Sequence, residues 1–126
     1  MKIDRIDHFV LTVRDLEATC AFYAKALGMQ VVTFAGGRKA LAFGRQKINL
    51  HVAGREFEPR AALATPGSGD FCLVTAEPLE DAMAHLRASG VEILEGPVAR
   101  TGATGALRSV YFRDPDGNLV EVSNEA

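Results

Sequence analysis

Residues 6–29 of the chain read IDHFVLTVRDLEATCAFYAKALGM, and this stretch decides how the rest of the sequence is interpreted. Phe9, Leu11 and Val13 alternate with the residues between them, which is the period of two that marks a β-strand. Asp15 is a suitable N-cap, because its short carboxylate can accept a hydrogen bond from a free backbone N–H of the first helical turn. Apolar residues then recur at helical spacing until a glycine ends the pattern. A strand followed by an amphipathic helix is therefore predicted.

The second half of the chain repeats this pattern. Sliding the 126-residue sequence by 63 residues places Leu16 on Leu79 and Glu17 on Glu80, and the helical spacing of the apolar residues agrees as well. Each half thus predicts a strand, a helix and three further strands. The predicted fold class is α+β, built from two βαβββ modules. The expected ranges are one domain over 1–126, with modules at about 5–53 and 70–124 and a connector at 54–69.

The expected elements follow from the same periodicity and from the turn residues between them. The first module should hold a helix over about 15–27 and strands near 29–35, 39–43 and 47–53. The second should hold a helix from Pro78 to Gly90 and strands over 71–75, 91–94, 107–113 and 118–123, with a tight turn at 114–117. The glycine-containing stretch 96–105 is expected to interrupt the second module, as a solvated loop or as a lid over a ligand site.

Composition excludes several classes of function. With 48% hydrophobic residues spread along the chain, there is material for one core but no run of about 20 apolar residues that would span a bilayer. No secretory signal opens the sequence, so the expected location is the cytoplasm. The net charge of −2, with no block of like charge, argues against a nucleic-acid partner. Cys20 and Cys72 form no paired motif and are expected to be small buried residues.

Three residues have the side-chain type and strand placement of metal ligands. His8 lies on the first strand, and His51 and Glu121 lie on the last strand of each module, where a mostly buried sheet would usually carry apolar residues. Either histidine alone could be a structural, hydrogen-bonded residue. Glu121 stands between two valines and needs solvent or a cation partner. Two imidazoles and one carboxylate are donors that suit a divalent metal with open coordination positions.

The opening stretch, together with YFRDPDGNLVEVS at 111–123, resembles the vicinal oxygen chelate superfamily, which includes glyoxalase I, fosfomycin resistance proteins, extradiol dioxygenases and bleomycin-binding proteins. The resemblance covers the whole chain. It implies the glyoxalase/bleomycin resistance/dihydroxybiphenyl dioxygenase fold, in which the modules form a cupped mixed sheet. Residues 37–51, GRKALAFGRQKINLH, resemble the small glyoxalase-domain proteins labelled virulence proteins.

Carried over residue by residue, the resemblance assigns His8, His51 and Glu121 as metal ligands. The fourth family position falls by the repeat on Phe71, which cannot be a ligand. The implied cofactor is a divalent ion, with Ni, Zn, Mn and Fe(II) all open. The implied partner is a small molecule with two neighbouring oxygens that chelates the ion.

The expected activity is that of a metal-dependent, glyoxalase-type enzyme that acts by proton transfer or addition, with Glu121 as a ligand that also serves as general base. A ring-cleaving Fe(II) dioxygenase and a metal-free binding or resistance protein are the alternatives. A homodimer is expected. Asn49 shares strand parity with His51, and Ser109 and Tyr111 share it with Arg113, on the strand before the tight turn. These four residues around the expected cavity are the substrate-contact candidates.

Overall fold

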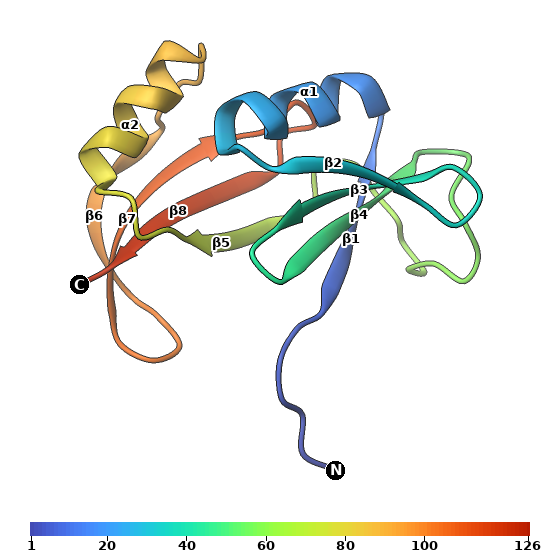
Figure 1. Ribbon diagram of the computed structural model, residues 1–126, viewed down its shortest axis with the longest axis horizontal. Coiled ribbons are helices and arrows are strands. Elements are labelled where there is room, and N and C mark those ends of the chain that lie inside the picture. The colour runs from blue at the N-terminus through green and yellow to red at the C-terminus, as the bar shows by residue number, and fades with distance from the viewer. The chain divides into compact units, whose positions relative to one another are not determined.

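The computed structural model describes all 126 residues and divides into two compact units, Met1–Pro66 and Gly67–Ala126. Both units have the predicted βαβββ order (Figure 1). Unit 1 consists of β1 (His8–Val13), α1 (Leu16–Leu27), β2 (Gln30–Phe34), β3 (Arg38–Phe43) and β4 (Gln46–Val52). Unit 2 consists of β5 (Asp70–Val74), α2 (Leu79–Ala88), β6 (Glu95–Thr101), β7 (Ala106–Arg113) and β8 (Leu119–Glu125).

Each unit forms its own four-stranded mixed sheet. The strand orders are β1-β4-β3-β2 and β5-β8-β7-β6, so the first strand of each unit is an edge strand paired in parallel with the last. The other pairs are antiparallel. Since successive strand residues point to opposite faces, one face of each sheet carries the buried apolar residues that pack with the helix. The other face is available for polar side chains.

The ends of α1 follow from local hydrogen bonding. The Asp15 side chain accepts a hydrogen bond from the Ala18 N–H at 3.0 Å, as an N-cap should. Gly28 ends the helix in the left-handed conformation with φ of 64°, which only glycine adopts without a steric penalty. Tyr23 faces the core and is fully buried. The predicted helix is therefore confirmed.

The second half of unit 2 differs from the prediction. The strand expected over 91–94 is absent, and the stretch 96–105, expected to be a loop or lid, is mostly strand β6 in a hairpin with β7. Gly96 and Pro97 suggested a loop, but they occupy a register irregularity between Glu95 and Val98. A side chain at Gly96 would lie 2.5 Å from the Ser109 carbonyl oxygen, so close strand approach explains this glycine.

A network of side chains holds the turn between β7 and β8. Asp114 accepts hydrogen bonds from the backbone N–H groups of Asp116 and Asn118, both at 2.9 Å, and from the Asn118 side chain at 2.8 Å. Asn118 in turn accepts one from the Gly69 N–H at 2.7 Å. Asp114 and Asn118 are both buried. The predicted turn at 114–117 is confirmed, and its acidic and amide residues fix the backbone before β5 and β8.

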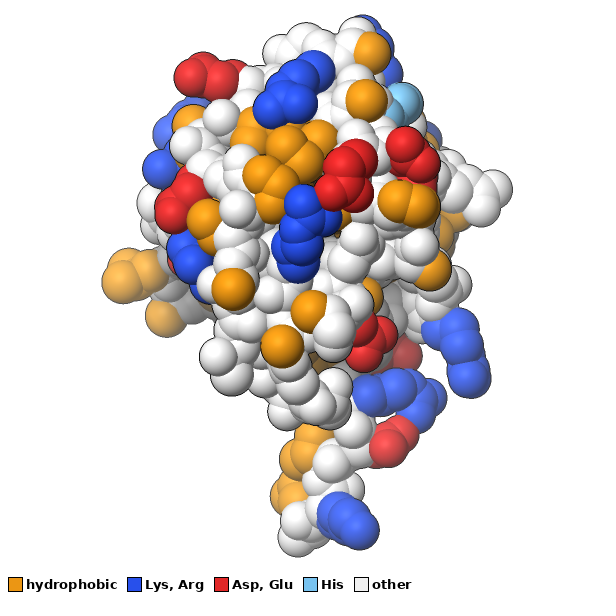
Figure 2. Space-filling view, turned by 90° about the vertical axis from the view of Figure 1, so that its left-hand side faces the viewer, with side chains coloured by type: hydrophobic (Ala, Val, Ile, Leu, Met, Phe, Trp, Pro, Cys, Tyr) orange, Lys and Arg blue, Asp and Glu red, His pale blue; other side chains and the backbone are white.

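Two further observations concern the surface. Cys72, expected to be buried, is exposed because it lies on the polar face of edge strand β5, and Cys20 is half-buried. The side of the molecule drawn in Figure 2 carries basic and acidic side chains side by side, with no continuous field of one sign. None of the helices has the length and hydrophobicity needed to cross a membrane.

Candidate functional site

Unit 1 has a cavity of about 550 Å³ on the polar face of its sheet. Alternate residues of β1 and β4 form its floor, and their neighbours Leu11, Ile48 and Leu50 are buried on the opposite face. Part of the segment that follows β4 lies along the cavity. The lining residues are His8, Val10, Thr12, Arg38, Asn49, His51, Pro59, Arg60, Ala61 and Ala64.

His8 is held by a neighbouring carboxylate. Its Nδ1 lies 2.8 Å from Oδ1 of Asp7, while 44% of its side chain stays exposed. A carboxylate on one ring nitrogen fixes the ring and leaves the other nitrogen for a ligand. The edge position on β1 therefore presents an oriented imidazole to the cavity.

His51 is 3% exposed and lies between a cation and an aromatic ring. Its Nε2 is 3.4 Å from an Arg38 guanidinium nitrogen, and the Phe57 ring meets it edge-on with centroids 5.6 Å apart. Burial first, and the positive charge of Arg38 second, lower the pKa of His51 below the usual 6.5. The imidazole is therefore kept neutral, which is the form that accepts a hydrogen bond or binds a metal.

Asn49 carries an unsatisfied polar atom in the same cavity. The residue is 6% exposed, and its Oδ1 has no hydrogen-bond partner. Buried side-chain oxygens are nearly always paired. A hydrogen-bond donor or a cation that reached the enclosed Asn49 oxygen would remove the cost of leaving it unpaired.

The pairing of β1 with β4 sets the spacing of these groups. His51 pairs with Thr12, four residues after His8, whereas Asn49 pairs with Val10, two residues after His8. At about 3.3 Å per residue the offsets along the strands are about 13 Å for His51 and about 7 Å for Asn49. His8 and His51 thus share a face and a cavity, but they can bind the same ion only if their side chains bend toward each other along the strands. Asn49 is the nearer donor.

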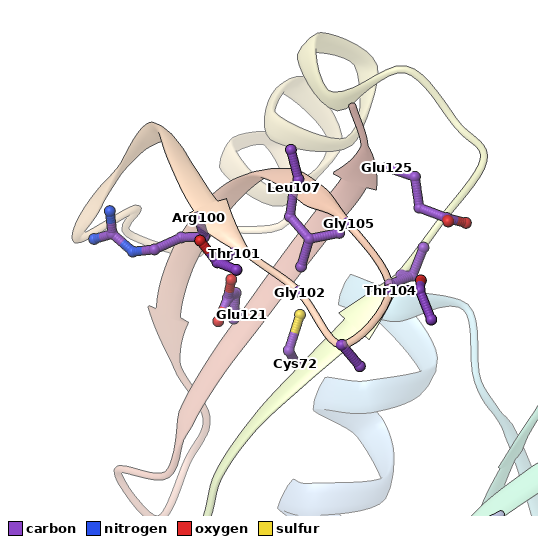
Figure 3. A pocket seen from close by; sticks show the side chains of 12 residues that line it. Cys72, Arg100, Thr101, Gly102, Thr104, Gly105, Leu107, Glu121 and Glu125 are labelled. Atoms are coloured by element: carbon purple, nitrogen blue, oxygen red, sulfur yellow. The ribbon is translucent and has the colours of Figure 1, made fainter.

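Unit 2 has its own cavity, of about 530 Å³, where the hairpin of β6 and β7 extends over the polar face of the sheet. Its lining includes Glu121 from β8 and Cys72 from β5, which are register partners. In Figure 3 the Cys72 thiol points toward the loop at Gly102, and Glu121 lies near Thr101. A carboxylate is therefore placed in a half-enclosed space with hydroxyl and thiol neighbours.

Hydrogen bonds tie Glu121 to this sheet. Ser123 donates to the Glu121 carboxylate at 3.3 Å, and the Ser123 Oγ lies 2.6 Å from Oγ of Ser109 and 3.2 Å from the Cys72 sulfur. Although Cys72 is exposed as a residue, partial desolvation of its thiol is the main cause that raises the thiol pKa, and the nearby Glu121 charge adds to it. The thiol is therefore held protonated, as a weak donor rather than a nucleophile.

Tyr111 pairs with Glu121 across β7 and β8. Its hydroxyl accepts a hydrogen bond from Arg100 Nε at 2.9 Å, and Arg100 also contacts Glu95 at 3.3 Å. Burial raises the pKa of Tyr111, and the Glu121 charge raises it further, although Arg100 opposes this. The phenol stays protonated and can donate a hydrogen bond from its position beside Glu121.

The remaining substrate-contact candidates are placed as follows. Ser109 is fully buried, and its hydroxyl is bound to Ser123. Arg113 is exposed and donates to the Gly117 carbonyl of its own turn at 3.4 Å. Neither residue lines the unit 2 cavity, and Tyr111 does not line it either. Their roles in binding stay predictions, whereas Asn49 lies in the unit 1 cavity.

The structure corrects the position assigned to Phe71. β1 begins at His8 and β5 begins at Asp70, so the strands superimpose with an offset of 62 and Phe71 matches Phe9. The slide of 63 aligned the helices, but the start of α2 lies nine residues after the start of β5, whereas the start of α1 lies eight residues after the start of β1. Asp70 is thus the counterpart of His8, and its identity was missed. The matching Phe-x-Leu in both strands was the sequence signal that could have revealed it.

The parallel registers of the two units agree with this correspondence. Asp70 pairs with Leu119, and Glu121 lies two residues after Leu119. In the same way, His8 pairs with Lys47, and Asn49 lies two residues after Lys47. Imidazole, amide and carboxylate oxygens are suitable donors for a divalent metal. No three His, Cys, Asp or Glu side chains are gathered closely enough in the structure to hold an ion. Each unit by itself therefore offers a donor pair.

Comparison with known proteins gives matches over nearly the whole chain. The model of the Glyoxalase/Bleomycin resistance protein/Dioxygenase superfamily matches residues 5–122. The virulence protein STM3117 of Salmonella typhimurium is 56% identical over 123 residues, which are 98% of this chain and 85% of that protein. The glyoxalase domain-containing protein RDO1 of Mycosarcoma maydis is 51% identical, over 98% of this chain and 70% of that protein. An integron cassette protein of V. cholerae, VCH_CASS1, matches with a TM-score of 0.98 and 58% identity, over 100% and 98% of the two chains.

Two more distant relatives have names that state a reaction. The biphenyl-2,3-diol 1,2-dioxygenase 3 of Rhodococcus globerulus is 32% identical over 94% of this chain and 62% of that protein. A lactoylglutathione lyase from Agrobacterium tumefaciens matches with a TM-score of 0.75 and 25% identity, over 98% and 96% of the chains. The fold, the duplicated βαβββ unit and these matches agree, and the chain belongs to the glyoxalase/bleomycin resistance protein/dioxygenase superfamily.

Proposed function

We propose that this protein is a divalent-metal-dependent enzyme of glyoxalase type that acts on a small, oxygen-rich metabolite. The observation that carries the proposal is the unit 1 cavity, which is lined by His8, by His51 and by the buried Asn49, whose side-chain oxygen has no hydrogen-bond partner. Such a face is costly to leave unsatisfied, because unpaired buried polar groups are destabilising. It is the kind of surface that a metal and its chelating substrate would satisfy.

His8 and Glu121 are the two proposed ligands with the clearest setting. Asp7 orients His8, and Ser123 donates to the Glu121 carboxylate. The β4 ligand is His51, as predicted from the sequence, or Asn49, which the register places nearer to His8. When bound, a divalent ion supplies Lewis-acid stabilisation of negative charge that develops on a substrate oxygen.

The chain's own groups would move and hold the proton. The Glu121 carboxylate is the proposed base, and the protonated Tyr111 phenol beside it can donate to a developing oxyanion. Part of the substrate would lie in the unit 1 cavity, away from bulk water.

Metal analysis of protein purified without chelator tests the proposal. We expect about one ion per site in the wild type, with loss of at least about tenfold in affinity for His8→Ala and for Glu121→Ala. Asn49→Ala and His51→Ala separate the two β4 candidates, and His85→Ala on α2 is the matched histidine control. Sub-stoichiometric metal that none of the four site variants changes would contradict the proposal and favour a metal-free binding protein.

A ring-cleaving dioxygenase is the second candidate, because the chain is 32% identical to the biphenyl-2,3-diol dioxygenase over 122 residues. Two imidazoles and a carboxylate on Fe(II) are a ligand set used by oxygen-activating enzymes. Oxygen uptake by iron-loaded protein with catechol and 2,3-dihydroxybiphenyl would support it. No uptake, together with metal-dependent turnover of a non-aromatic substrate, would exclude it.

We also propose that the protein is a homodimer in solution. Each unit leaves a first-strand edge with no neighbour in its sheet, β1 in unit 1 and β5 in unit 2. Sedimentation equilibrium should give about twice the 13.5 kDa chain mass. A monomer that binds metal fully would contradict the dimer without affecting the metal proposal.

A further inference from the structure

The segment before β1 gathers exposed apolar side chains. Residues 1–7, which we call the arm, are all exposed. Met1 and two isoleucines are the large apolar residues within it, with Ile3 77% exposed and Ile6 64% exposed. No other segment of the chain exposes three, since the rest lie singly or in pairs: Val10, Val31, Phe57, Leu63, Val74 and Leu94. Single exposed apolar residues are normal on a protein surface, whereas a group of them marks a contact site.

The arm runs past the end of the unit 1 sheet. The parallel ladder of β1 and β4 begins where His8 pairs with Lys47, and β4 itself begins at Gln46. Figure 1 shows the chain before β1 leading away from the strands of this unit. No backbone hydrogen bond joins residues 1–5 to the rest of the chain, and one side-chain bond, from Gln46 to the Ile6 carbonyl at 2.9 Å, holds the base of the arm. The arm is therefore attached at one end and open along its length.

The charges of the arm favour a protein partner. Lys2 and Arg5 balance Asp4 and Asp7, and Arg5 pairs with Asp4 inside the arm. Segments that bind anionic lipid or nucleic acid gather several basic residues without compensating acids. An arm whose charges cancel gains nothing from such a polyanion. It can instead approach a surface of mixed sign, such as the face drawn in Figure 2, without net repulsion.

The area of the arm decides between a second copy and an unrelated protein. An extended six-residue segment exposes about 1,100 Å², and docking it on a flat surface covers about half of this area. One arm on an unrelated partner would bury about 1,100 Å² in total, counting both surfaces, which is below the range of stable interfaces. A two-fold dimer uses each surface twice, so two exchanged arms would bury about 2,200 Å². The arm by itself is therefore sufficient for a homodimer and insufficient for a complex with an unrelated protein.

We propose that the two chains of the homodimer exchange their arms, so that Ile3 and Ile6 of each chain pack on the surface of the other copy. This assigns the contact that holds the proposed homodimer. It rests on that dimer, and on neither the metal nor the reaction. Burial of both isoleucines on the partner removes from water the apolar surface that a single chain leaves exposed.

Sedimentation equilibrium of the full chain over a range of concentrations tests this inference. Ile3→Asp should raise the dimer dissociation constant at least about 100-fold, because the dimer contains this side chain twice and each new carboxylate would lose water. Ile3→Leu keeps the apolar area and should stay within about fivefold of the wild type. Leu63→Asp is the matched control, since this side chain is 87% exposed, lies outside the arm and acquires the same charge, and it should leave the dissociation constant unchanged. Circular dichroism checks that each variant keeps its fold.

A nitroxide on the arm shows which chain the arm touches. It is attached at Lys2→Cys in copies that also carry Cys20→Ser and Cys72→Ser, and these copies are mixed with an equal amount of ¹⁵N-labelled wild type. We expect amide signals of the ¹⁵N-labelled copies to broaden, because the nitroxide can reach them only from another molecule. Ile3→Asp in the nitroxide-bearing copies should abolish the broadening.

Three outcomes would overturn the inference. A wild-type dimer on which Ile3→Asp and Leu63→Asp have equal effects would be held elsewhere, and the homodimer would stand without exchanged arms. No broadening in a sample that sedimentation shows to be dimeric would place the arm on its own chain. A monomeric wild type would contradict the homodimer itself, and the exchanged arms with it. None of the three bears on the metal, whose content is measured separately.

Discussion

The two units have the same βαβββ order, but the polar faces of their sheets carry opposite chemistry. At the matching positions, unit 1 has His8 and Asn49, and unit 2 has Asp70 and Glu121. Around these positions unit 1 adds an arginine held by aromatic rings, and unit 2 adds hydroxyl groups, a thiol and a phenol. The helix-side residues stay apolar in both units because they form the cores. A duplicated unit can therefore keep its fold while its open face diverges.

This difference predicts a division of roles. The basic and neutral groups of unit 1 suit the binding of the substrate, and the carboxylate of unit 2 suits proton transfer. Variants that exchange or remove groups at matching positions should therefore damage different properties.

The largest effect is expected from Glu121→Gln. The amide keeps the shape and one oxygen donor but removes the charge and nearly all the basicity, so turnover of a substrate found by screening should fall about 100- to 10,000-fold. Metal affinity should fall much less. Asn49→Gln, at the corresponding position of unit 1, should change substrate affinity more than turnover. Near wild-type turnover in Glu121→Gln would show that Glu121 is a ligand without a catalytic role.

The next largest effect concerns stability and the turn between β7 and β8. Asp114→Ala leaves three hydrogen-bond donors of a buried network without their acceptor, and about 3 kcal/mol of unfolding free energy should be lost. Unit 1 has no such network at its β3–β4 turn, so Arg45→Ala should change stability by less than about 0.5 kcal/mol. Urea unfolding midpoints measure the stability change of both variants, provided that the dependence of the unfolding free energy on urea concentration stays the same. Equal midpoints would show that the turn of unit 2 is not held by its side chains.

The sequence predicted most of this fold because its signals were local. Asp15 and Gly28 marked the ends of α1, and alternation marked the strands. The exception was β6, where Gly96 was interpreted as a loop residue. Its glycine is required by the close approach of the Ser109 carbonyl on β7, which is a tertiary contact that no local pattern reveals.

The candidate site was less predictable because it depends on register. Parity placed Asn49 and His51 on one face, and this is confirmed by the unit 1 cavity. Which of the two lies near His8 depends on the register between β1 and β4. A shift of one residue in the repeat alignment also made Phe71, rather than Asp70, the counterpart of His8 in unit 2. Arg38 gave no signal at all, because its place in the cavity comes from its contacts with His51 and with the aromatic rings that hold it.

A smaller effect should appear in the pH dependence of stability. His51 has a lowered pKa in the folded protein, so below pH 6.5 the unfolded chain binds a proton that the folded chain does not. The contribution of His51 to the unfolding free energy is therefore fully present above pH 6.5 and is lost as the pH drops toward the folded pKa. It amounts to about 1.4 kcal/mol for each unit by which folding lowers the pKa. His51→Gln should flatten this part of the curve, and His85→Gln on the exposed face of α2 should not. The measurement is the urea unfolding midpoint at several mildly acidic pH values. The slope of the midpoint against pH is compared between the wild type and each variant. An unchanged slope in His51→Gln would mean that the folded and unfolded chains bind a proton at His51 equally well.

The smallest effect is expected at Tyr111, where two charges act in opposite directions. Burial and Glu121 raise the pKa of this phenol, and Arg100 lowers it. Glu121→Gln should therefore move the pKa down, because a neutral neighbour no longer disfavours the phenolate, and Arg100→Gln should move it up. The chain has two tyrosines, and Tyr23 is fully buried in unit 1, so ¹³C NMR of the tyrosine Cζ atoms separates Tyr111 from an internal reference. Shifts of the same sign in both variants would show that the charges reach Tyr111 only through a rearrangement of β7. Shifts of opposite sign would place the phenol in the field of the carboxylate, as a protonated donor beside the proposed base.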